Sequence, residues 1–123
     1  MEKQIMSKTV NKVLLLGNVG KDPEIASTNG GTLVAKLSLA TSERFKDKQG
    51  EWQERTEWHK IVAWDRLGEI CKEYLSKGKL VYIEGRISTR SFKDREGNDR
   101  KVTEIVAQTM RSLDHGGSDS VPF

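Results

Sequence analysis

The chain has 123 residues, of which 35% are hydrophobic and 32% are charged, so it has the size of one domain that can bury a core. It contains no run approaching the roughly 20 apolar residues of a membrane span, and its first residues, MEKQIMSK, lack the apolar segment of a secretory signal. Its single cysteine excludes an internal disulfide and a cysteine cluster for zinc, and we expect a cytoplasmic protein.

Charge is unevenly distributed along the chain. All 21 Lys and Arg residues lie at or before Arg111, whereas two of the 18 acidic residues, Asp114 and Asp119, lie after Leu113. Residues 1–113 thus combine 21 cations with 16 carboxylates, a net charge of +5. A basic body with an acidic end favours a polyanionic partner for the body and a separate role for the end.

The first third of the chain has the pattern of strands and turns. Residues 10–19 are rich in aliphatic and β-branched residues, and Gly17 among them predicts a bend or a bulge. Turn residues follow at Asp22-Pro23 and at Asn29-Gly30-Gly31. Between 33 and 39 the odd positions are apolar and alternate with Lys36 and Ser38, as in a half-buried strand.

One helix is predicted after a third strand at 56–64. Asp65 is a suitable N-cap residue, and Gly78 stands where a glycine ends a helix. Apolar residues recur between them at helical spacing and form one face: Leu67, Ile70, Cys71, Tyr74 and Leu75. We interpret Cys71 as a small core residue rather than a reactive thiol.

Two further strands, at 79–91 and 101–113, flank a turn at Gly97-Asn98. The order is therefore three strands, one helix and two strands. This predicts an all-β protein, a five-stranded OB-fold barrel with one helix between strands 3 and 4. Closure of the barrel would remove the exposed edges of the sheet.

Two hairpin tips repeat one another. The first reads FKDKQG (45–50) and the second FKDREG (92–97). Each combines a flat ring with neighbouring cations and a glycine turn, which suits a projecting arm that binds nucleic acid. The alternative is two unrelated solvated hairpins with ordinary turn chemistry.

Strand alternation indicates where the larger rings point, because residues two apart share a face. Trp58, Lys60 and Trp64 share one face of the third strand. In the fourth strand Ile83 and Ile87 are predicted to face the core, which turns the opposite set outward: Arg86, Ser88, Arg90 and Phe92. Rings beside cations fit single-stranded nucleic acid, since every base can stack on a ring and cations neutralise the phosphates.

Other interpretations of the aromatic residues remain open at this point. Trp58 or Trp64 could be a core residue, as a single Trp in a strand often is. Trp52 lies within the first hairpin, where it is either a further contact or an exposed ring without a role. Glu57 and His59 could suggest acid–base or metal chemistry, but a metal site usually needs three or more ligands and the chain has two histidines.

The chain resembles the bacterial-type single-stranded DNA-binding proteins (SSB). The resemblance covers nearly all of residues 9–113 and rests on these segments: VNKVLLLGNVGKDPE (10–24), LATSERFKDK (39–48), TEWHKIVAWDRLGEI (56–70), YLSKGKLVYIEGRISTRSFKD (74–94) and the terminal VPF. It implies an OB fold, a homotetramer and wrapping of single-stranded DNA. It also implies base stacking by Phe45, Trp58, Trp64 and Phe92, and a subunit contact at His59.

The resemblance also assigns a role to the last residues. Family members typically end in acidic residues followed by a hydrophobic residue, Pro and Phe, and this tip docks on enzymes of replication, recombination and repair. The matching residues here are Asp119, Val121, Pro122 and Phe123. The acidic run is thin and the linker short, so a vestigial tail is the alternative.

These observations predict a flexible N-terminal extension (1–8), an OB-fold DNA-binding domain (9–113) and a short disordered acidic tail (114–123). We expect a non-catalytic protein without metal or cofactor, associated with the nucleoid, that coats and protects single-stranded DNA independently of sequence. The predicted phosphate contacts are Lys12, Arg44, Lys46, Lys48, Lys60, Arg86, Arg90 and Lys93. The alternatives are an adaptor related to primosomal replication proteins, and an OB-type nuclease that would need convergent carboxylates.

Overall fold

The computed structural model describes residues 8–113. The predicted tail, with Asp119, Val121, Pro122 and Phe123, lies outside the described residues, as does the predicted N-terminal extension except Lys8. The described part contains β1 (Val13–Val19), β2 (Glu24–Ser27), β3 (Leu33–Lys46), β4 (Trp52–Trp64), α1 (Asp65–Tyr74), β5 (Leu80–Lys93) and β6 (Asp99–Ser112).

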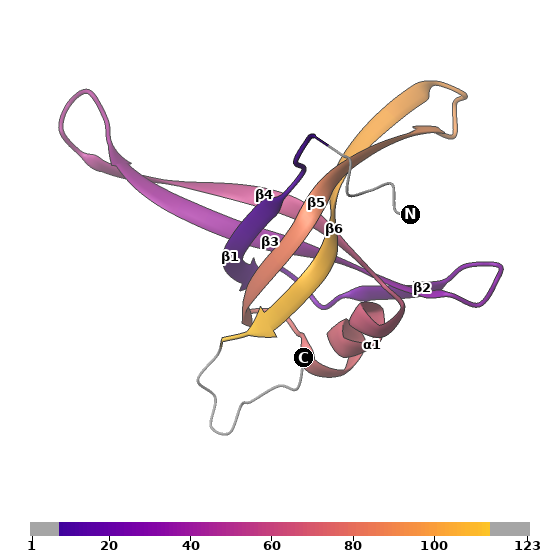
Figure 1. Cartoon of the computed structure of the whole chain (residues 1–123). Helices are drawn as coiled ribbons and strands as arrows, with labels where there is room; N and C mark the ends of the chain where they lie inside the picture. Colours follow the sequence, from indigo (N-terminus) through magenta and orange to yellow (C-terminus); the bar gives the residue numbers. More distant parts are fainter. Residues whose placement is uncertain (1–7, 114–123) are drawn as a thin grey trace.

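Five of these strands close into a barrel (Figure 1). Their order is β1–β5–β6–β4–β3, and β3 returns to β1 through pairs such as Val19↔Leu39. The β4–β6 pairing is short and parallel, at pairs such as Ile61↔Ile105. Because α1 joins β4 to β5, the third and fourth barrel strands along the chain, the predicted five-stranded OB barrel with one helix is confirmed.

The core lies inside the barrel and is covered at one end by α1. Inward-facing Leu39, Ile61 and Ile83 are completely or almost completely buried. Cys71 on the buried face of α1 is fully buried beside Met110, with 3.7 Å between the two sulfurs. The predicted core role of Cys71 is therefore confirmed, and its burial raises the pKa of the thiol to about 12.

Two glycines lie where backbones approach closely. A Cβ atom at Gly17 would lie 2.2 Å from the Ala40 carbonyl oxygen, so the predicted bend or bulge at Gly17 is a close contact between β1 and β3. A Cβ atom at Gly85 would lie 2.4 Å from the Val106 carbonyl oxygen. The recorded irregularity lies at this second glycine, in the β5–β6 ladder.

The irregularity is a β-bulge. Glu84 is opposite Thr109, whereas the next residue, Gly85, is opposite Ala107. Gln108 is therefore the extra residue on β6. The bulge shifts the inward-facing positions of β6 by one residue, which simple alternation along that strand does not anticipate.

Strand β2 was not predicted. Its four residues, EIAS, lie between the two predicted turns and pair with β3 through contacts such as Ile25↔Ala35. All four residues are exposed, so they carry no alternation of apolar and polar residues.

Both predicted helix boundaries were wrong in detail. Asp65 is the first helical residue, with a φ of 52°, and the N-cap is Trp64, without a side-chain cap hydrogen bond. The helix ends at Tyr74, so Gly78 lies beyond it, in the turn before β5. There Gly78 adopts a φ of 95° and donates its N–H to the Val19 carbonyl oxygen at 2.8 Å.

The core prediction for the fourth strand was half wrong. Ile83 is fully buried, but Ile87 is 49% exposed. Pairing between β1 and β5 ends at Val13↔Gly85, so Ile87 lies beyond the closed part of the barrel although it points in the same direction as Ile83.

Two long hairpins extend from the barrel (Figure 1). We call residues 42–56, from the β3–β4 hairpin, the first arm, and residues 88–104, from the β5–β6 hairpin, the second arm. Both consist mostly of exposed residues. Within residues 8–113, no helix has the length and apolar character needed to cross a membrane.

Candidate nucleic-acid interface

Strand β4 carries a row of exposed residues on its outer face. Ile61 and Ala63 point into the core, so alternation turns Trp58, Lys60 and Trp64 outward, although Val62, which shares their face, is buried. The Trp58 side chain is 59% exposed and that of Trp64 is 42% exposed, so neither ring is a core residue. Both rings are available to a ligand on the barrel surface.

Trp58 packs so closely against Gly20 that a side chain there would collide with the ring in its present position. A Cβ atom at Gly20 would lie 2.4 Å from Cζ3 of the Trp58 ring. Gly20 follows β1, and its N–H donates to the Ser38 carbonyl oxygen at 2.9 Å. The backbone at the end of β1 therefore supports one face of this exposed indole.

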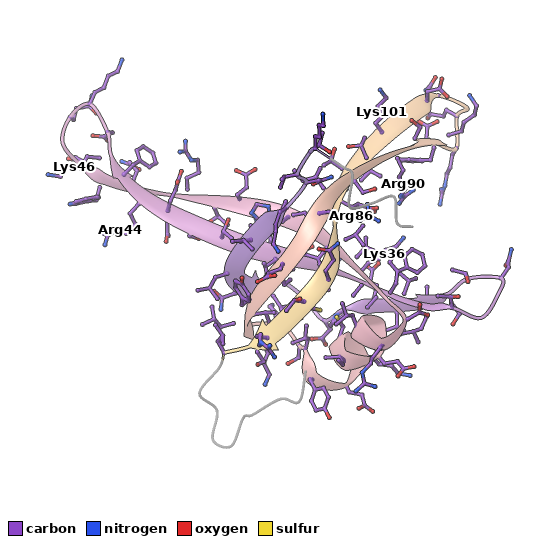
Figure 2. All side chains as sticks on the ribbon, viewed as in Figure 1. Lys36, Arg44, Lys46, Arg86, Arg90 and Lys101 are labelled. Carbon is purple, nitrogen blue, oxygen red and sulfur yellow. The ribbon has the colours of Figure 1, made fainter. Side chains whose placement is uncertain are left out.

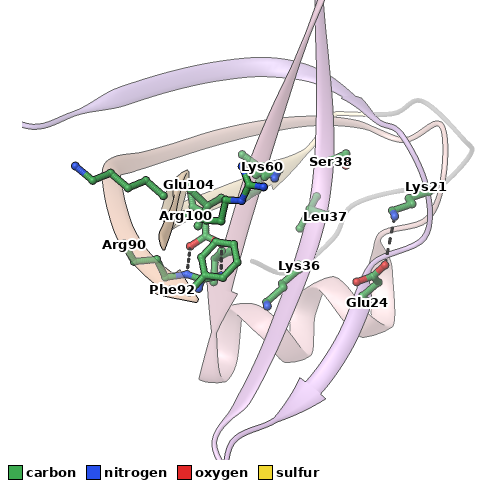
Figure 3. Close-up of a pocket in the computed structure, with 14 residues that line it drawn as sticks. Lys21, Glu24, Lys36, Leu37, Ser38, Lys60, Arg90, Phe92, Arg100 and Glu104 are labelled. Carbon is green, nitrogen blue, oxygen red and sulfur yellow. Dashed lines mark hydrogen bonds and ion pairs between the residues drawn. The ribbon is translucent and has the colours of Figure 1, made fainter. Parts of the chain in front are cut away.

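A groove of about 420 Å³ runs beside this row, between the barrel and the second arm (Figure 3). Lys36 and Lys60 contribute to it from the barrel strands. The second arm contributes Arg90, Phe92 and Lys101. The groove thus combines one aromatic ring with several cations, and it includes Lys60, the middle residue of the exposed row.

Carboxylates neutralise some of the cations that line the groove. Arg90 binds Glu104 through two hydrogen bonds of 3.2 Å, and Lys21 lies 3.3 Å from Glu24. Among the residues described, the side chains of Lys36, Lys60 and Lys101 make no ion pair or hydrogen bond. These three lysines are the groove cations that are available to an incoming phosphate. Arg100, which also lines the groove, binds Asp94 at 2.9 Å.

Sequence reasoning missed Lys36 and Lys101. Lys36 occupies an even, outward position in the predicted strand at 33–39, so the alternation that selected Lys60 could have found it. Lys101 pairs with Ser91, on the face of the second arm opposite Phe92, and alternation would have rejected it. Its long side chain nevertheless reaches the groove.

The first arm carries its own ring and cations. The Phe45 side chain is 39% exposed, and the Arg55 guanidinium lies 5.1 Å from its ring centroid. Glu43 holds Arg55 through a hydrogen bond to Nε of 3.2 Å. The second arm repeats this arrangement, because Arg90, held by Glu104, lies 5.7 Å from the Phe92 ring centroid. In both arms a carboxylate therefore fixes an arginine against the phenylalanine.

Both arms end in the same turn. The Asp47 carboxylate accepts hydrogen bonds of 2.9 Å from the N–H groups of Gln49 and Glu51. Asp94 does the same with the N–H groups of Glu96 and Asn98, also at 2.9 Å. The glycines of the two turns have φ angles of 80° and 83°. Turn chemistry thus explains the Asp and the Gly of the repeated hexapeptide, whereas the rings and cations still need an explanation.

Hydrogen bonding also shifts the pKa values of these carboxyls. The N–H of Glu51 and other donors in the turn hold the pKa of Asp47 below its usual range. Arg100, which binds the second oxygen of Asp94 at 2.9 Å, and then the turn N–H groups lower the pKa of Asp94. Both turns therefore contain carboxylates that are charged at neutral pH.

The other predicted phosphate contacts are dispersed. Lys12 lies 3.4 Å from Glu84, whose pKa is lowered by the Tyr82 hydroxyl and by Lys12 itself. Lys93 binds Asp99 at 2.7 Å. Figure 2 shows Arg44 and Lys46 on the first arm, far from the groove, and Arg86 on β5. Lys48 lies in the turn of the first arm.

The predicted subunit-contact residue, His59, shares a face of β4 with Ile61 but lies at the open end of that face, where it lines a surface pocket with Val13 and Ile87. It is partly buried, and its Nε2 lies 2.9 Å from Oγ1 of Thr41. No group of three or more His, Cys, Asp or Glu side chains in the described part of the chain could hold a metal ion.

Comparisons with known proteins agree with these features. Residues 10–113 match the single-strand binding protein family. The single-stranded DNA-binding protein 1 of Chlorobaculum tepidum is 52% identical over 119 residues, which cover 94% of this chain and 74% of that protein. The structure of a Plasmodium falciparum SSB complex with ssDNA is similar with a TM-score of 0.78 at 36% identity, over 88% of this chain and 98% of the other.

The family match includes every barrel strand, the helix and both arms. The matched range therefore contains the exposed rings and the residues that line the groove. The chain belongs to the single-strand binding protein family, a family of binding proteins and not of enzymes, as the sequence predicted.

Proposed function

We propose that this protein binds single-stranded DNA independently of sequence, and coats and protects it during replication, recombination and repair in the cytoplasm, in association with the nucleoid. The observation that carries the proposal is the exposed row of Trp58, Lys60 and Trp64 beside the cationic groove that contains Phe92. The related proteins support it, because one is named as a single-stranded DNA-binding protein and the other was solved with ssDNA.

Stacking explains both the preference for single strands and the tolerance of sequence. Bases would stack on Trp58, Trp64 and Phe92 around the barrel and on Phe45 of the first arm, each contributing about 1–3 kcal/mol. Every base has a flat face, so stacking does not select among sequences. In a duplex these faces are covered by neighbouring base pairs, so the same rings find no partner.

Phosphate binding would add affinity and make it depend on salt. Five of the predicted contacts have no carboxylate partner within residues 8–113: Arg44, Lys46, Lys48, Lys60 and Arg86. Lys12, Arg90 and Lys93 are already paired with carboxylates. A phosphate must replace these partners, so we expect the three paired cations to contribute less.

The test is a salt series of binding to labelled oligo(dT), followed by anisotropy, with a duplex of equal length for comparison. Tight binding to the single strand that weakens with salt, and far weaker duplex binding, is the expected result. Equal or negligible binding to both DNAs would contradict the proposal and favour the adaptor alternative.

Substitution of one ring tests the observation that carries the proposal. Trp58→Ala is expected to weaken oligo(dT) binding about 5- to 150-fold, which corresponds to 1–3 kcal/mol, with little change in unfolding temperature. Tyr74→Ala is the matched control, because this half-exposed ring lies on α1, outside the row and the groove. Equal affinities of the two variants would show that Trp58 is not a stacking residue.

We further propose a homotetramer with His59 at a subunit contact. Leu14 and Leu16, on the outer face of β1, are exposed aliphatic side chains that such an assembly would cover. Multi-angle light scattering is expected to give four times the mass of the chain. A stable monomer would rule the assembly out.

The proposal includes recruitment of replication, recombination and repair enzymes by Asp119, Val121, Pro122 and Phe123. Its support is the sequence, in which an aromatic residue could enter an apolar pocket while the carboxylate of Asp119 meets basic residues. Phe123→Ala is expected to abolish capture of such enzymes and to leave oligo(dT) affinity unchanged. Undiminished capture would indicate a vestigial tail.

A further inference from the structure

Trp52 is an exposed ring that the row on the barrel and the groove do not include. It begins β4 in the first arm, and its side chain is 58% exposed, as much as that of Trp58. The Arg44 guanidinium lies 5.1 Å and the Lys46 ammonium 5.3 Å from its ring centroid. The register pairs Trp52 directly with Lys46.

Trp52 shares a strand face with the other two tryptophans. The β3–β4 ladder runs without a bulge from Val34↔Trp64 to Lys46↔Trp52, so alternation is uninterrupted along β4. Trp52, Trp58 and Trp64 therefore face the same side of the ladder. The indole of Trp52 extends the exposed row of the barrel along the arm.

The spacing suits a strand of DNA that continues from the barrel onto the arm. Trp58 lies six positions after Trp52, which is about 20 Å at the rise of a β-strand. Stacked nucleotides rise about 3.4 Å each, so this distance corresponds to about six stacked nucleotides and to fewer in an extended strand. A single strand bound at Trp58 can therefore reach Trp52.

The two cations beside Trp52 differ from the arginines beside the phenylalanines. Arg55 and Arg90 are each held by a glutamate. Arg44 and Lys46 have no carboxylate partner among residues 8–113. Their charge is available to a phosphate, while much of the adjacent indole remains accessible to a base.

We propose that Trp52, Arg44 and Lys46 form a further nucleotide-binding site on the first arm, where one base stacks on the indole and the cations bind the neighbouring phosphates. The site rests on the proposed function, because it extends the path of the same single strand. It assigns a role to the one tryptophan of this chain that lies outside the row on the barrel.

The first experiment uses the emission of Trp52 alone. The chain has three tryptophans, so Trp58→Phe combined with Trp64→Phe leaves Trp52 as the only one and keeps rings at the other two sites. Binding of an oligo(dT) of about 16 nucleotides, the upper range for one OB fold, is measured by both anisotropy and tryptophan emission. We expect the emission to be quenched in step with the rise in anisotropy.

The second experiment uses the chain with the other tryptophans intact. Trp52→Ala is expected to lower affinity for the same oligo(dT) at least about fivefold, the low end for one stacked base, and Trp52→Phe to restore most of it. Gln49→Ala is the control, because that side chain lies in the same arm and makes no hydrogen bond within the described part of the chain.

The outcomes distinguish a failure of the proposed Trp52 site from a failure of single-stranded DNA binding by the whole protein. A rise in anisotropy without quenching of Trp52, or a Trp52→Ala affinity equal to that of Gln49→Ala, would overturn the site and leave the proposed function intact. Absence of any anisotropy change with the unsubstituted protein would overturn both.

Discussion

At the scale of single residues, Gly20 determines where the Trp58 ring lies. The nearest atom to a Cβ at this position is Cζ3 of the ring, at 2.4 Å, and this atom is the far end of a side chain that can rotate away. Backbone atoms are absent from the three nearest neighbours of that Cβ, so the fold can tolerate a methyl group there.

Gly20→Ala is therefore expected to displace the Trp58 ring and weaken oligo(dT) binding several-fold, with only a small change in unfolding temperature. Anisotropy and thermal unfolding measure the two effects. Gly30→Ala is the control, because the nearest atom to its Cβ would be 4.0 Å away. Unchanged affinity in Gly20→Ala would mean that the precise position of the ring is unimportant.

Cys71 provides a second prediction at this scale. Burial raises the pKa of its thiol to about 12, and the thiolate is the reactive species. We expect no reaction of the native protein with a thiol reagent at pH 8, and full reaction once denaturant has unfolded the barrel. Rapid labelling of the native protein would show that α1 opens at its buried face.

At the scale of the elements, the turns of the two arms each depend on one carboxylate. The pKa of Asp94 is lowered from 3.8, first by Arg100 and then by the turn N–H groups. The charged form is thus favoured in the folded arm. Its stabilisation is complete above the ordinary value near 3.8 and is lost as the pH falls through the lower pKa of the folded state.

We therefore expect the second arm to be equally protected at pH 7 and pH 5, and to loosen in stronger acid. Hydrogen exchange at the Asn98 amide, which donates to Asp94, is the appropriate measurement. Asp94→Asn should remove this acid dependence. The backbone N–H of Ile87, which donates to Oδ1 of Asn11 at the base of the arm, provides an internal reference for the exchange rates. Equal acid sensitivity in Asp94→Asn would assign the effect to another group.

The elements differ in how far sequence could predict them. The barrel strands were predictable because the core imposes alternation on them, as at 33–39. Strands β3 and β4 are longer than the predicted strands at 33–39 and 56–64, because they continue into stretches that are exposed on both faces and have no such pattern. Strand β2 had no alternation for the same reason, and the bulge at Gln108 changes the inward positions within one strand.

In the candidate interface, the exposure of the rings was predictable from the sequence, whereas the pairing of the cations was not. Alternation correctly turned Trp58 and Trp64 outward, since Ile61 and Ala63 on the other face of β4 fill the core. Phe92 is also exposed, but it lies on an arm whose residues are exposed on both faces, so alternation does not explain its exposure. The ion pairs were not predictable, because they join residues far apart in sequence, such as Arg90 and Glu104. These pairs determine which cations are available, so the predicted set of phosphate contacts mixed paired and unpaired residues.

At the scale of the whole molecule, the distribution of unpaired charge should determine how binding responds to salt. Each phosphate neutralised on a single strand changes the slope of log K against log salt by about 0.7. Lys36 lines the groove without a partner in the described range, whereas Lys93 is bound to Asp99.

Lys36→Gln is accordingly expected to weaken binding and to make the slope about 0.7 shallower, and Lys93→Gln to change both less. A salt series of oligo(dT) affinity for the two variants measures the difference. Equal slopes would mean that the ion pairs in the free protein do not govern which cations meet the DNA.

The barrel cannot close while only its first half has been synthesised. β1 is the first strand made, yet Val13 pairs with Gly85, and β6 must join β4 through a short parallel contact near Ile105. A nascent chain that ends before β5 therefore has unpaired strand edges and exposed apolar residues that belong to the core. Because its pairings are distant in sequence, closure of the barrel waits for β5 and β6, which are synthesised after the strands that they join.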